Sequence, residues 1–62
     1  MFDIVIFDGD NVLEKRGPFT YDAAVQEAEW HVNHDGATRV QIVDVDEGVV
    51  LETIGETRRA RV

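Results

Sequence analysis

The stretch from Ile4 to Leu13, which reads IVIFDGDNVL, constrains the fold more than any other part of this chain. An apolar, β-branched run leads into Asp-Gly-Asp-Asn, and a second apolar pair follows. Asp, Gly and Asn tolerate positive φ and bond to their own backbone, so this tetrapeptide is typical of a tight turn. The pattern predicts a β-hairpin with strands over Phe2–Phe7 and Val12–Arg16, the second stopped by Gly17-Pro18.

The chain has 62 residues and no cysteine. A domain this small buries only about 60% of the surface that its unfolded chain exposes, and no disulfide can add stability. We expect one domain over residues 1–56, a flexible basic tail over residues 57–62, and self-association as a further source of stability. The longest apolar run is too short for a membrane span and no basic leader precedes it, so the expected location is cytoplasmic.

The same ten residues also resemble the first motif of the haloacid dehalogenase superfamily, with four apolar residues before Asp8-x-Asp10-x-Val12-Leu13. The resemblance implies that Asp8 is a nucleophile that binds Mg²⁺ and that Asp10 is an acid/base, for phosphoryl transfer. That family is built on parallel strands whose crossovers each take a dozen or more residues, and after Leu13 this chain has room for one helix. We therefore favour the hairpin and a protein that is not an enzyme. Phosphoryl transfer at Asp8 and Asp10 is the remote alternative.

A helix and a second hairpin are predicted after Pro18. Thr20 is a suitable N-cap, and the run from Tyr21 to about His34 contains neither Gly nor Pro. Its apolar stripe consists of Tyr21, Ala24, Val25, Ala28 and Val32. Two β runs follow, over Thr38–Val45 and Val49–Ile54, around a turn that ends at Gly48. The predicted fold is α+β, ββαββ: a four-stranded antiparallel sheet with one helix packed on one face.

Alternation along the strands assigns side chains to the two faces of this sheet. The residues expected to meet the helix are Ile4, Ile6, Val40, Ile42 and Leu51. The residues expected on the other face are Val5, Phe7, Val43 and Val45, and no further element remains to cover them. An uncovered apolar face on so small a domain favours a homodimer.

The net charge is −7, and its distribution is uneven. Arg58, Arg59 and Arg61 leave only three cationic residues in the rest of the chain against 13 acidic ones. So acidic a body repels phosphate backbones, and three arginines are too few for strong binding by the tail. We expect no binding of nucleic acid by the folded body, and a basic protein partner stays open.

Two local clusters of side chains are candidate cation sites. Asp8, Asp10 and Glu14 could offer oxygens, but an EF-hand loop needs Asp or Asn and then Gly where this chain has Val and Leu. His31 and His34 could share a metal, but histidines near a helix C-terminus are favoured by the helix dipole, and we expect both rings to be largely solvated. No metal or cofactor is therefore expected.

Trp30 lies about 140° from Val25 on the helical wheel, away from the apolar stripe. Ala23, Gln26, Glu27 and His34 share its side of the helix. A lone Trp on a polar, acidic helix side is a plausible binding anchor. The other interpretation is that its ring folds over the helix edge onto a neighbouring loop or the tail.

The expected function is that of a small acidic protein-interaction module without catalytic chemistry, which self-associates through the uncovered sheet face. The residues expected to make protein contacts are Trp30, Val5, Phe7, Val43 and Val45. The alternative is a small acidic inhibitor or adaptor, of the kind that small viral genomes encode, that binds a larger host protein.

Overall fold

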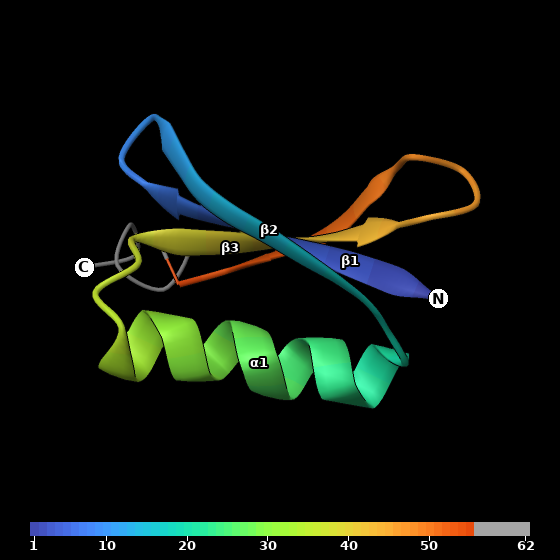
Figure 1. Cartoon of the computed structure of the whole chain (residues 1–62), viewed down its shortest axis with the longest axis horizontal. Coiled ribbons are helices and arrows are strands. Elements are labelled where there is room, and N and C mark those ends of the chain that lie inside the picture. Colours follow the sequence, from blue (N-terminus) through green and yellow to red (C-terminus); the bar gives the residue numbers. More distant parts are fainter. Residues whose placement is uncertain (56–62) are drawn as a thin grey trace.

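The computed structural model describes residues 1–55, which form one sheet and one helix (Figure 1). The elements are β1 (Phe2–Asp8), β2 (Asn11–Phe19), α1 (Tyr21–His34), β3 (Arg39–Asp44) and β4 (Val50–Ile54). The sheet order is β2-β1-β3-β4 and every pair of neighbours is antiparallel. The two hairpins therefore join through their first strands, and α1 lies across one face. The predicted α+β, ββαββ fold is confirmed.

The first hairpin turns at Gly9-Asp10, where Gly9 has a φ of +62°. Strand β2 does not stop at Gly17-Pro18 as predicted, because its pairing resumes beyond a bulge with Phe2 opposite Phe19. β2 is an edge strand, so the missing N–H of Pro18 removes no hydrogen bond to a further strand. β2 therefore extends as far as the start of the helix.

Helix α1 begins where its cap predicts. The Oγ1 of Thr20 accepts a hydrogen bond from the Ala23 N–H at 3.4 Å. At the other end the Asp35 N–H donates to the His31 carbonyl, and Gly36 follows with a φ of +76°. Within residues 1–55, no helix is both long and apolar enough to cross a membrane.

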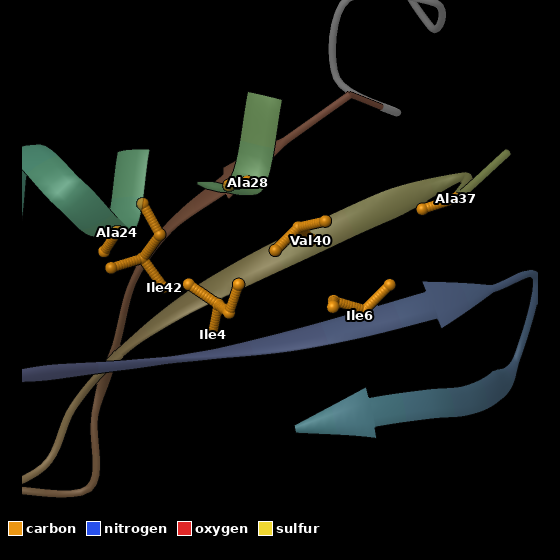
Figure 2. Packing of buried hydrophobic residues seen from close by; sticks show 7 residues of the cluster. All are labelled: Ile4, Ile6, Ala24, Ala28, Ala37, Val40 and Ile42. Atoms are coloured by element: carbon orange, nitrogen blue, oxygen red, sulfur yellow. The ribbon is translucent and has the colours of Figure 1, made fainter. Parts of the chain in front are cut away.

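The core lies between α1 and the two central strands (Figure 2). Its fully buried aliphatic side chains alternate along β1 and β3, and Figure 2 shows them pointing toward the helix: Ile4, Ile6, Val40 and Ile42. On the helix the buried apolar positions are Ala24 and Ala28, whose small side chains let α1 lie close to the sheet. Tyr21, predicted in the same stripe, lies at the rim with its ring edge against Phe2.

The second hairpin departs from the predicted register. A β-bulge shifts the pairing between Ile42 and Val43, so that Val43 pairs with Val50 and Ile42 pairs with Glu52. The prediction that Leu51 faces the helix is wrong: Leu51 falls in the bulge and is 50% exposed. Ile54 packs against the core instead.

Candidate interaction surfaces

The sheet face away from α1 is called the open face here. The strand register assigns ten side chains to it: Asp3, Val5, Phe7, Val12, Lys15, Arg39, Gln41, Val43, Val50 and Thr53. Val5, Phe7 and Val43, all predicted on this face, are half-buried by their neighbours within the sheet. Val45, also predicted there, is exposed just beyond β3, and its N–H donates to the Met1 carbonyl at 3.2 Å. No other element within residues 1–55 lies over this face (Figure 1).

Phe7 and Arg39 lie opposite each other on β1 and β3 and contact each other on the open face. The guanidinium carbon of Arg39 lies 4.1 Å from the centroid of the Phe7 ring, within the range of a cation–π contact. The Nη1 of the same arginine donates to the Gly9 carbonyl at 2.9 Å. Arg39 thus covers one end of the apolar row and ties it to the hairpin turn.

The charges of the open face differ from those of the whole chain. Lys15 lies opposite Val5, and its Nζ is 3.8 Å from Oδ2 of Asp3. Of the side chains assigned to this face, only Asp3 is acidic, against the two cations Lys15 and Arg39. A second copy of the chain would therefore meet little repulsion here, although the chain carries −7.

Exposed apolar side chains are frequent on the two hairpins. Outside α1, the large exposed hydrophobic residues are Met1, Val12, Leu13, Val45, Val49, Val50 and Leu51. Most of them lie on the two hairpin arms, whose tips rise away from the helix in Figure 1. Two of them, Val12 on β2 and Val50 on β4, are assigned to the open face, so the half-buried row has an exposed valine on each edge strand.

The Asp-Gly-Asp-Asn turn is held by hydrogen bonds to Arg39, the first residue of β3, and to Thr38, which precedes it. The Gly9 N–H donates to Oγ1 of Thr38 at 2.8 Å, and the Thr38 N–H donates to the Phe7 carbonyl at 2.9 Å. Asp8 and Asp10 are exposed on an antiparallel hairpin, which is not the parallel sheet that the dehalogenase resemblance implies. No cluster of three or more His, Asp or Glu side chains that could hold a metal occurs in the described part of the chain.

Trp30 is 51% exposed on the outer side of α1. Its ring lies edge-on to His31, with centroids 5.0 Å apart, and at a tilt to His34, with centroids 5.9 Å apart. Within residues 1–55 these ring contacts of Trp30 are to its own helix, and the predicted alternative contact with the tail lies outside the described residues.

His31 is the residue that the sequence interpretation missed. It is only 3% exposed, so the expectation of a solvated ring is wrong for this histidine. Its Nδ1 donates to Oδ2 of Asp35 at 2.9 Å, while Nε2 has no hydrogen-bond partner among the described residues. The nearest carboxylate oxygen to Nε2 is Oε1 of Glu27, at 3.9 Å. The sequence does contain an indication of this burial: His31 follows Ala28 by three residues and Ala24 by seven, which places it on the same side of the helix as these two alanines.

Glu27 also links the helix to strand β2. Its Oε1 lies 3.7 Å from Nη1 of Arg16, whose Nε is 3.9 Å from Oε2 of Glu14. All three side chains are about half exposed, so solvent weakens these ion pairs. They mark the edge along which α1 and β2 approach each other.

At the N-terminal end of α1, the Tyr21 hydroxyl donates to a carboxylate oxygen of Glu52 on β4. This hydrogen bond raises the pKa of Tyr21 above its ordinary value, with smaller contributions from desolvation and from the charges of Glu52 and Asp22. The contact joins the helix to the edge strand at the rim of the core.

The predicted domain boundary at residue 56, the basic tail over 57–62 and its arginines Arg58, Arg59 and Arg61 lie outside the described residues. Comparison with protein-family models, with curated proteins and with solved structures found no match to this chain.

Proposed function

We propose that this chain is a small acidic protein-interaction module, without catalytic chemistry of its own, that self-associates through the open face. The observation that carries the proposal is the half-buried row of Val5, Phe7 and Val43 in the middle of a sheet face that no element of residues 1–55 covers. Burial of such side chains against a second copy removes apolar surface from water, at roughly 25 cal/mol per Å².

Charge supports a second copy of the chain as the partner at this face. Acidic side chains lie on the helix, on the turns and at the sheet edges, whereas the open face has one acid and two cations. Two identical acidic chains approach each other at least cost through this face.

Light scattering coupled to gel filtration tests the proposal. The expected mass is twice the 7.0 kDa of one chain at high micromolar concentration. The mass of a monomer under these conditions would contradict the proposal.

The variant Val43→Lys tests which surface is used. Because a two-fold interface contains the substitution twice, we expect the dimer to weaken by about 100-fold or more in its dissociation constant. The matched control is Gln26→Lys, which adds the same charge at an exposed position of α1 and should leave the dimer intact. Equal loss of the dimer in both variants would point to a different interface.

A further inference from the structure

We propose that the outer side of α1 around Trp30 binds an arginine- or lysine-bearing segment of a partner protein. The cationic group would lie over the indole ring and against the carboxylate of Glu27. This surface, called the Trp30 flank, consists of Ala23, Gln26, Glu27, Trp30 and His34. It lies on the helix and not on the open face, so the inference does not depend on the proposed self-association.

The indole of Trp30 offers a preformed platform. It is half exposed, and its ring lies next to those of His31 and His34 at centroid distances of 5.0 and 5.9 Å. Trp is enriched in binding hot spots because its large ring offers much contact area with few rotatable bonds. A cation is the ligand group best suited to the face of an indole.

The charge of α1 favours the same ligand. The helix contains no Lys or Arg over its 14 residues, and its acids are Asp22, Glu27 and Glu29. The nearest cation to Glu27 on another element is Arg16, at 3.7 Å, and that arginine is shared with Glu14. The Glu27 carboxylate is therefore only weakly neutralised, and an anionic ligand such as a phosphate group would be repelled.

His31 supports the flank from its buried side. Its Nδ1 donates to Oδ2 of Asp35 at 2.9 Å, and its ring, only 3% exposed, lies edge-on to the indole of Trp30. Its Nε2 lies 3.9 Å from Oε1 of Glu27, so His31 contacts both residues of the flank that would meet the cation.

The probe is a peptide of alternating arginine and glycine, with a glutamate–glycine peptide of the same length as its counterpart. Trp30 is the sole tryptophan, so its fluorescence and the resonance of its indole N–H report binding at one place. We expect a saturable change with the arginine peptide at low salt and no change with the glutamate peptide. An indole signal that does not respond to the arginine peptide overturns the proposal.

Variants distinguish this flank from general attraction to an acidic protein. Measured by anisotropy of a labelled arginine peptide, Trp30→Ala should weaken binding roughly 5- to 30-fold, and Glu27→Gln about 3-fold. The matched control is Glu47→Gln, which removes the same charge from the exposed turn before β4 and should leave binding unchanged. Equal effects of Glu27→Gln and Glu47→Gln, or full binding by a folded Trp30→Ala variant, would overturn the assignment.

The same titration separates this inference from the proposed function. A Val43→Lys variant that is monomeric should bind the arginine peptide as tightly as the unmodified chain does, because Val43 is on the open face. Loss of peptide binding in that variant, with the fold intact by circular dichroism, would show that the Trp30 flank does not act alone.

Discussion

The two faces of the sheet are built from the same strands, but α1 covers only one of them. On the helix face, Ile4 and Ile42 pair across β1 and β3 and are fully buried beneath Ala24 and Ala28. One position along, Val43 is on the open face and only half-buried. The difference shows that strand alternation selects two apolar sets here, while the single helix closes only one of them.

The largest expected effect comes from adjacent truncations on opposite faces. Ile42→Ala opens a cavity beneath the helix and should lower the free energy of unfolding by about 2–5 kcal/mol. Val43→Ala removes a side chain that is already half exposed and should cost the dilute monomer about 1 kcal/mol or less. Urea denaturation of both variants measures the contrast, and equal losses would contradict the distinction between the faces.

A smaller effect is expected from Gly17→Ala, which tests whether the close approach of β1 and β2 at this position requires a glycine. Gly17 has a φ of +140°, and an added Cβ would clash with Oδ1 of Asp3 and lie 3.0 Å from the Asp3 Cα. We expect a loss of about 1–3 kcal/mol in thermal or urea unfolding. The matched control is Gly9→Ala. Gly9 also has a positive φ, of +62°, but an added Cβ there meets no atom within 4 Å. This variant should therefore lose only the free energy of placing alanine at a positive φ, which is the smaller loss. A larger loss for Gly9→Ala would refute this account.

The smallest expected effect concerns the rim of the helix face and depends on pH. Hydrogen bonding to Glu52 raises the pKa of Tyr21 in the folded protein, so the folded state holds the phenol proton more tightly than the unfolded chain does. The associated stability is present below the ordinary tyrosine pKa of about 10 and is lost as the pH rises through the folded value. Titration of phenolate absorbance measures this pKa directly, since Tyr21 is the sole tyrosine. In Glu52→Ala the midpoint should fall toward the ordinary value, and an unchanged midpoint would remove Glu52 as the cause.

Most local structure could be predicted from the residues involved. The turn at Gly9, the N-cap Thr20 and the turn that ends at Gly48, with a φ of +70°, lie where their residue types indicate. Alternation also assigned Val5, Phe7 and Val43 to the face without a helix. These features depend on neighbours within a few residues, so short-range preferences decide them.

The errors have a common origin in pairings between distant residues. Pro18 continues in a strand because β2 has a partner on one side only, which depends on the strand order. Leu51 leaves the core because a bulge opposite β3 advances the register by one residue. Neither the strand order nor the bulge has a signature in the adjoining residues.

By itself the sequence determined the type and order of every element, the apolar face of the helix and the acidity of the surface. Only the tertiary structure decided that β1 and β3 pair at the centre, that a bulge moves Leu51 out of the core, and that His31 is buried. The physical reason is that local preferences arise from the backbone and its nearest neighbours, whereas burial of a side chain is set by whichever distant surface packs against it.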